Sequence, residues 1–166
     1  MNEDSINLDS TDLQLLRQLQ RDASLSNQAL ASLLHLSPPT CLRRVKRLQS
    51  LGLIEQQVAI LSRERLAEVT GHGLQAIVEV SLDRQDSSSL MQFERKAVAE
   101  NGVQQCWRVS PGPDFVLIIA TLDMPAYLAL SQKLFTQDAN VRNVKAFFAV
   151  KRAKFSTELP IPEALR

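Results

Sequence analysis

The sequence predicts an α+β protein in which a helical domain comes first and a domain of alternating strands and helices follows. Two observations support this division. Every aromatic residue lies at or beyond Phe93, so the first half must build its core from aliphatic side chains alone. Apolar residues recur at helical spacing before Gly52, whereas the runs typical of strands dominate the second half. We therefore expect domains at 1–60 and 73–166, joined by a linker or hinge at 61–72.

Two short helices open the first domain. Asp9 or Ser10 can cap the first helix and Ser26 the second, because each of these side chains can accept a hydrogen bond from a free backbone N–H group. Leucines then recur at intervals of three and four residues, as on one face of a helix. The leucines expected to be buried are Leu13, Leu16 and Leu19 in the first helix and Leu30, Leu33 and Leu34 in the second.

A third helix is expected from Pro38 or Pro39 to Leu51. Proline suits the first turn of a helix, where its missing N–H group has no intrahelical partner, and Ser37 can accept from the free N–H groups there. Gly52 can then end the helix as a left-handed C-cap. Only a tight turn separates the second helix from the third, so the segment has helix-turn-helix organisation.

The chain after Gly52 changes its pattern. Apolar and polar residues alternate through Ile60, which predicts one or two short strands that form a wing or a link to the next domain. Beyond the linker, the predicted elements follow the order βαββαβ, the split arrangement of ferredoxin-like folds. The predicted strands are 74–82, 103–110, 114–122 and 141–151, and the predicted helices are 88–101 and 124–137.

One face of the predicted sheet would be covered by the two helices, and the other would need water, a ligand or a second subunit. The strand 114–122 is apolar on both of its faces, which favours a subunit. We therefore expect a homodimer that forms through the sheets of the second domain.

The third helix concentrates positive charge, although the whole chain has a net charge of only +1. No Asp or Glu lies between Ala23 and Ile54. Helical spacing predicts an apolar stripe of Cys41, Leu42, Val45 and Leu48 opposite a polar stripe of Thr40, Arg43, Arg44 and Arg47. A helix about 10–12 Å across fits a DNA major groove about 12 Å wide, where arginine can pair with guanine. The charges alone would also suit a solvated surface, but the two preceding helices and the tight turn favour DNA binding.

The residues expected to contact DNA lie at the starts of the second and third helices and along the third. They are Ser26, Asn27, Gln28, Ser37, Pro38, Pro39, Thr40, Arg43, Arg44, Lys46 and Arg47. Double-stranded DNA is thus the first predicted partner.

Catalytic and metal sites are not expected. The two cysteines, Cys41 and Cys106, are far apart and lack a CxxC pattern, while His35 and His72 have no nucleophile or carboxylate arrangement beside them. No phosphate-binding glycine loop occurs. We therefore predict no enzyme activity and no cofactor. The polar, acidic start and the lack of a long apolar run predict a cytoplasmic protein without a membrane partner.

The motifs of residues 8–55 resemble those of the leucine-responsive regulatory protein/AsnC (Lrp/AsnC) family of transcription regulators. The opening LDSTDLQLLRQLQRD, the segment LSPPTCLRRVKRLQSLGLI and the late TELPI (157–161) carry the resemblance. It implies a second domain of the ligand-sensing, ferredoxin-like (RAM) type. It also implies dimers that assemble into octamers or other rings, and an amino-acid effector held between dimers near the loop that joins the second and third strands.

That loop corresponds to residues 107–117, where the family pattern resembles V-S/T-G-x-x-D-Y/F. This chain has Val109, Ser110, Asp114 and Phe115, but Pro111 stands in place of the glycine and Gly112 follows one position later. The residues expected to bind an effector are Ser110, Gly112 and Asp114. Asp114 can pair with a ligand amine, or it can be a turn carboxylate that accepts backbone N–H bonds.

Pro111 removes a backbone donor, and the last strand has Val144 and Ala146 where members of the family often have small hydroxyl residues. These departures predict an apolar effector, such as leucine, methionine or another apolar amino acid or branched-chain compound, or none. Two other functions remain open at this point. The chain could be a sensing or interaction module that no longer binds DNA, or an architectural DNA-binding protein that needs no effector.

Overall fold

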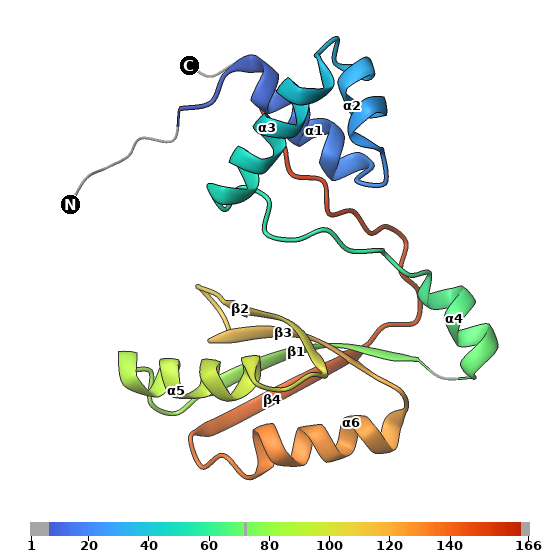
Figure 1. Cartoon of the computed structure of the whole chain (residues 1–166). Helices are drawn as coiled ribbons and strands as arrows, with labels where there is room; N and C mark the ends of the chain where they lie inside the picture. Colours follow the sequence, from blue (N-terminus) through green and yellow to red (C-terminus); the bar gives the residue numbers. More distant parts are fainter. Residues whose placement is uncertain (1–6, 72, 164–166) are drawn as a thin grey trace. The chain divides into compact units, whose positions relative to one another are not determined.

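The computed structural model describes residues 7–71 and 73–163 (Figure 1). The chain divides into two units. One holds the described residues up to Ile60 together with those from Lys154 onward, and the other comprises Leu61–Ala153. No helix in the described ranges is long and apolar enough to span a bilayer. His72, which the sequence analysis placed in the linker, lies outside the described residues.

The helical unit contains α1 (Ser10–Arg21), α2 (Asn27–Leu33) and α3 (Pro38–Ser50). The expected caps are confirmed: Asp9, Ser26 and Ser37 each accept a hydrogen bond from a backbone N–H group in the first turn of their helix. Asp9 forms a full capping box, because its backbone N–H group also donates to the Asp12 carboxylate at 3.2 Å.

The core of this unit differs in part from the expected leucine stripes. Its fully buried members are Leu15, Leu30, Ala31, Cys41 and Leu48. Leu33 was expected to be buried but is 52% exposed, and Leu42 is 45% exposed. The packing face of α2 lies between Leu30 and its neighbour Ala31, and it continues at Leu34, which is partly buried against the core. Leu33 lies to one side of this face and is therefore exposed.

The end of α3 follows the prediction closely. Gly52 is left-handed, with φ of 71°. The backbone N–H groups of Gly52 and Leu53 donate to the carbonyls of Gln49 and Leu48 at 3.0 and 3.1 Å. These are the two bonds of a Schellman motif, in which glycine avoids the steric cost of the left-handed conformation.

The predicted wing is wrong, since no strand occurs in residues 53–62 of the structure. Alternating apolar residues form a strand only where a second strand pairs with them, and this segment has none beside it in its unit. The linker instead contains a helix, α4 (Arg63–Thr70), which Ser62 caps and the left-handed Gly71 ends.

The second unit has the predicted βαββαβ order. Its strands are β1 (Leu74–Leu82), β2 (Val103–Arg108), β3 (Phe115–Thr121) and β4 (Val141–Phe148), and its helices are α5 (Ser87–Val98) and α6 (Met124–Ser131), the latter continued by a π-helical turn, η1 (Gln132–Thr136). The strands pair antiparallel in the order β2-β3-β1-β4. Both helices lie along one face of the sheet, as Figure 1 shows.

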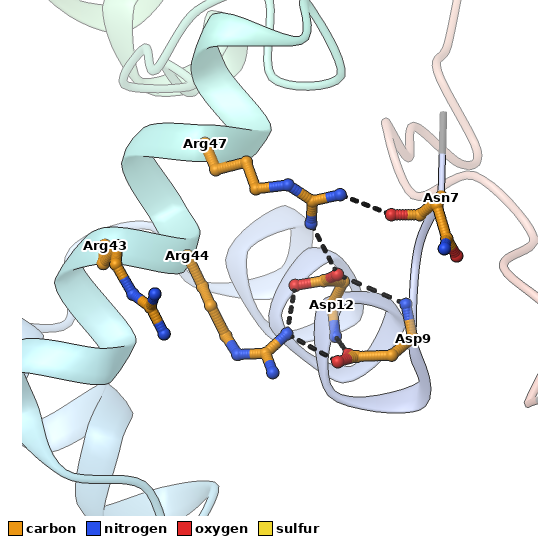
Figure 2. Close-up of a pocket in the computed structure, with 6 residues that line it drawn as sticks. All are labelled: Asn7, Asp9, Asp12, Arg43, Arg44 and Arg47. Atoms are coloured by element: carbon orange, nitrogen blue, oxygen red, sulfur yellow. Dashed lines mark hydrogen bonds and ion pairs between the residues drawn. The ribbon is translucent and has the colours of Figure 1, made fainter. Parts of the chain in front are cut away.

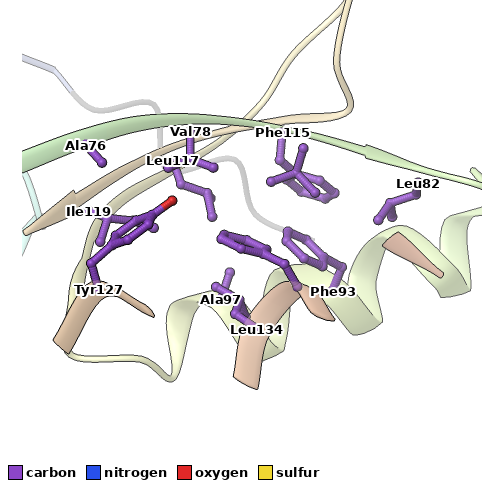
Figure 3. Close-up of a cluster of buried hydrophobic side chains, with 12 residues drawn as sticks. Ala76, Val78, Leu82, Phe93, Ala97, Phe115, Leu117, Ile119, Tyr127 and Leu134 are labelled. Carbon is purple, nitrogen blue, oxygen red and sulfur yellow. The ribbon is translucent and has the colours of Figure 1, made fainter. Parts of the chain in front are cut away.

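The core of the second unit lies between the sheet and these two helices (Figure 3). Alternate residues of the central strands point into it, as the pleat of a strand requires. They are Ala76, Val78, Val80 and Leu82 from β1 and Phe115, Leu117 and Ile119 from β3. Phe93 from α5 packs against Phe115 with ring centroids 4.8 Å apart.

The opposite face of the sheet, here called the outer face, is largely apolar, and no described helix of the second unit packs on it. In the register, Ile77 pairs with Ile118 and with Phe147, and Trp107 pairs with Val116. Ile77, Trp107 and Phe147 are 43%, 57% and 52% exposed. Three large apolar side chains are therefore open to solvent on one surface.

The C-terminal segment 154–163, here called the C-terminal strap, belongs with the helical unit and not with the sheet unit in which the sequence analysis placed it. The side chain of Gln20 on α1 donates to the Leu159 carbonyl and accepts from the Leu159 N–H group, both at 2.9 Å. Arg21 pairs with Glu158 at 2.6 Å. No periodicity marks such an extended segment, so its partner could not be inferred from local pattern.

Candidate nucleic-acid interface

The start of α3 is built from a cap, two prolines and a tie to α2. The Ser37 hydroxyl accepts from the Thr40 N–H group at 3.4 Å and donates to the Thr40 hydroxyl at 2.8 Å. The Asn27 amide donates to the carbonyl of Pro38 at 2.9 Å, which joins the first turn of α2 to that of α3. Ser37, Pro38 and Pro39 are exposed, so the start of α3 is open to a partner.

The cations of α3 fall into two groups, and the first group is bound within the protein (Figure 2). The Arg44 guanidinium pairs with Asp9 and with Asp12, each at 2.8 Å. Arg47 pairs with Asp12 at 3.0 Å and also donates to the carbonyl of Asn7. Both arginines therefore point toward the start of α1.

Asp12 is the centre of this cluster and is only 1% exposed. A buried carboxylate is tolerated when its charge is paired and its oxygens accept hydrogen bonds, and here two guanidinium groups and the Asp9 N–H group meet both needs. The N–H group of Asp12 donates to Asp9 and, with nearby Arg44, lowers the pKa of the Asp9 carboxyl. Hydrogen bonds to Asp12 and then Asp9 raise the pKa of Arg44.

The second group, Arg43 and Lys46, is exposed. In the part of the chain that the structure describes, neither side chain has a hydrogen bond or an ion pair. Arg43 lies at the edge of the hollow drawn in Figure 2 but takes no part in its contacts. These two cations, one turn apart on α3, are the ones free to meet a polyanion.

The predicted polar stripe is thus divided in space. Thr40 is tied to Ser37, Arg44 and Arg47 bind Asp12, and only Arg43 stays free. Sequence reasoning missed the role of Asp12, although an acid on the apolar side of a leucine-rich helix was a usable signal, because a carboxylate there needs a cationic partner. It also missed the exposure of Leu42.

The predicted effector loop is held to the sheet by Asp114. Its carboxylate accepts from the Leu82 N–H group at 2.7 Å and from the Gln85 amide at 3.3 Å. Its own N–H group donates to the Val80 carbonyl at 2.9 Å. Asp114 is therefore a loop carboxylate that accepts a backbone N–H bond, as one of the two expectations had it. Its role in ligand binding stays a prediction. Ser110 and Gly112 are exposed beside it.

Metal ligation finds no support in the side-chain arrangement. Across the described ranges, no three His, Cys, Asp or Glu side chains gather closely enough to bind a metal ion. Cys41 is buried in the helical core, and burial raises the pKa of its thiol.

Comparison with known proteins matches both parts of the chain to one family. An AsnC-type helix-turn-helix domain matches residues 8–49, and an Lrp/AsnC ligand-binding domain matches residues 75–159. The chain is 31% identical over 154 residues to the DNA-binding transcriptional activator DecR of Escherichia coli K12, covering 93% of this chain and 99% of that relative. It is 32% identical over 154 residues to the Bkd operon transcriptional regulator of Pseudomonas aeruginosa, covering 93% and 98% of the two chains.

A solved structure extends the match to three dimensions. A transcriptional regulator from Neisseria meningitidis, in complex with L-Met, matches with a TM-score of 0.80 at 30% identity, covering 93% of this chain and 97% of the other.

Proposed function

The chain belongs to the Lrp/AsnC family of helix-turn-helix transcription regulators, and we propose that it binds DNA through the exposed side of α3 under the control of an amino acid. The observation that carries the DNA-binding part is the pair of free cations, Arg43 and Lys46, on a helix that begins at an open N-terminal turn. In helix-turn-helix proteins, the start of this helix contacts base edges and basic residues contact phosphates.

Within this proposal the four cations of α3 have two different tasks. Arg43 and Lys46 contact DNA directly. Arg44 and Arg47 act as positioning residues, because their ion pairs with the buried Asp12 fix α3 against α1. The other polar residues predicted at the interface, Ser26, Asn27, Gln28, Ser37 and Thr40, together with Pro38 and Pro39, stay candidates for phosphate or base contacts.

The regulatory part of the proposal concerns the second unit. Ser110, Gly112 and Asp114 are the candidate residues for an apolar amino acid such as leucine or methionine. The relative from Neisseria meningitidis that was crystallised with L-Met supports this class of effector. We further propose that two copies join through the outer face of the sheet, that dimers assemble into an octamer or other ring, and that the protein acts in the cytoplasm without catalysing a reaction.

DNA binding can be tested by titrating the protein into a labelled duplex of its own promoter region and a random duplex of equal length, at several salt concentrations. Wild type should bind the promoter more tightly. Arg43→Ala should weaken promoter binding by about tenfold, the scale of one lost base or phosphate contact. The control is Arg95→Ala, which removes the same charge from an exposed site on α5 and should change nothing. Equal affinity for both duplexes in wild type would contradict the proposal.

Effector control can be tested by calorimetry with leucine and methionine, repeated with Asp114→Asn. Heat of binding that the variant loses supports the predicted site. Absence of heat with either amino acid, together with intact promoter binding, would favour an architectural DNA-binding protein. Heat without promoter binding would favour a sensing module that does not bind DNA.

A further inference from the structure

Leu42 is an apolar side chain on the part of α3 that would face DNA. It is 45% exposed and does not belong to the core of the helical unit. It precedes the free Arg43 and lies one turn before the free Lys46, whereas Cys41 and Leu48 on the other side of the helix are fully buried. The exposed side of α3 therefore combines two unpaired cations with one leucine.

The position of Leu42 in the helix matters as much as its exposure. It is the fifth residue of α3, which begins at Pro38. In helix-turn-helix proteins the N-terminal residues of this helix reach the base edges, while cations farther along meet the backbone. A side chain at this place is thus near the bases when α3 occupies the major groove.

Leucine has no hydrogen-bonding group, so it cannot distinguish the donors and acceptors of the base edges. The apolar feature that the major groove offers is the C5-methyl group of thymine. We propose that Leu42 is a specificity-determining residue that contacts a thymine methyl group in each half-site. This inference rests on the proposed DNA-binding function and goes beyond it by naming the base feature that is read.

The test begins with wild-type protein and a random-sequence duplex library, from which bound sequences are selected and a consensus duplex is made. Each thymine of the consensus is then replaced by deoxyuridine, symmetrically in both half-sites. Uracil lacks the methyl group but keeps the hydrogen-bonding edge. Affinity for wild type should fall by about fourfold per half-site at the contacted position, the factor expected for one buried methyl-sized group.

Leu42→Ala should bind the consensus about as weakly as wild type binds the uracil duplex, and it should lose nothing further when that thymine is replaced. This non-additivity identifies the direct contact. The matched control is Leu51→Ala, which shortens a leucine that is 37% exposed at the far end of the same helix. It should keep the full sensitivity to uracil. Circular dichroism verifies that both variants are folded.

Two outcomes would overturn the inference. Wild type could be indifferent to uracil at every thymine, or Leu42→Ala could retain the full uracil effect. In both cases a selected consensus would still support DNA binding, so only the role of Leu42 would fail. If wild type selects no consensus from the library, the proposed function itself fails.

Discussion

Asp12 decides which arginines of α3 are available to a partner. Its carboxylate is buried, so an unpaired charge there would be costly, and the nearest guanidinium groups belong to Arg44 and Arg47. Once both are engaged, Arg43 and Lys46 remain exposed. A single carboxylate on α1 thus decides which cations of another helix stay unpaired.

Replacement of Asp12 by asparagine should destabilise the helical unit, because it leaves two arginines beside an uncharged group. We expect the free energy of unfolding of this unit to fall by roughly 2–4 kcal/mol, somewhat below a fully buried pair because Arg47 is 43% exposed. Urea unfolding followed by circular dichroism measures the loss.

Trp107, the only tryptophan, lies in the sheet unit and provides an internal reference. The unfolding transition seen by Trp107 fluorescence, which reports on the sheet unit, should keep its urea midpoint. The unfolding transition of the helical unit should move to a lower urea concentration. The control Glu55→Gln removes an exposed charge in the same helical unit and should shift neither transition. An unchanged helical transition in the Asp12 variant would show that the cluster is energetically neutral.

At the scale of elements, helix α1 connects both ends of the helical unit. Its start receives the arginines of α3, and its end binds the C-terminal strap through Gln20 and Arg21. The Arg21 pair is exposed and contributes little, so the hydrogen bonds of Gln20 and Arg17 carry most of this attachment. Arg17 donates to the carbonyls of Pro162 and Glu163 at 3.0 and 3.2 Å. The motif TELPI, which the resemblance singled out, includes Glu158 and Leu159, the partners of Arg21 and Gln20.

Gln20→Ala should free the Leu159 part of the strap from α1, while Arg17 still binds the strap at Pro162 and Glu163. Loss of these two hydrogen bonds should lower the free energy of local opening at Leu159 by about 1 kcal/mol. The Leu159 amide should therefore exchange its hydrogen about fivefold faster than in wild type. NMR-detected amide exchange measures this directly. Gln14→Ala, an exposed glutamine on the same helix, should leave the Leu159 rate unchanged. Identical rates in wild type and Gln20→Ala would mean that the strap is not held by these bonds in solution.

At the scale of the whole molecule, the uncovered outer face of the sheet is the feature that most requires a partner. A sheet with one face packed and the other apolar leaves large side chains in water unless a second sheet covers them. Apolar side chains can pack against the same side chains of a second copy. On the outer face, Ile77 pairs with Ile118 and with Phe147. This supports the proposed dimer.

Ile77→Glu should weaken that dimer by at least about tenfold, because each subunit loses a buried apolar side chain worth about 1.5–3 kcal/mol and places a charge in the contact. Sedimentation at several protein concentrations measures the monomer–dimer equilibrium. Leu128→Glu provides the control, since Leu128 is 59% exposed on α6, which packs against the opposite face of the sheet. Dissociation in the control but not in Ile77→Glu would move the interface to the helical side.

Local sequence by itself determined the helices other than α4, the caps of the first three helices and the order of the strands. Asp9, Ser26, Ser37 and Gly52 act on backbone groups only a few positions away, so their effects follow from short-range geometry. The predicted strands required only period-two patterning and were found with slightly shorter ends. The wing failed because a strand also needs a neighbour, which alternation alone does not supply.

The tertiary structure decided which side of α3 faces outward and what holds it there. The bond between Arg44 and Asp12 joins residues 32 positions apart, and that between Gln20 and Leu159 joins residues 139 positions apart. Helical periodicity places Arg43, Arg44 and Arg47 on one polar side, but it cannot tell which of them will find a buried carboxylate. That choice depends on packing between helices, and it leaves Arg43 and Lys46 exposed and unpaired beside the exposed Leu42.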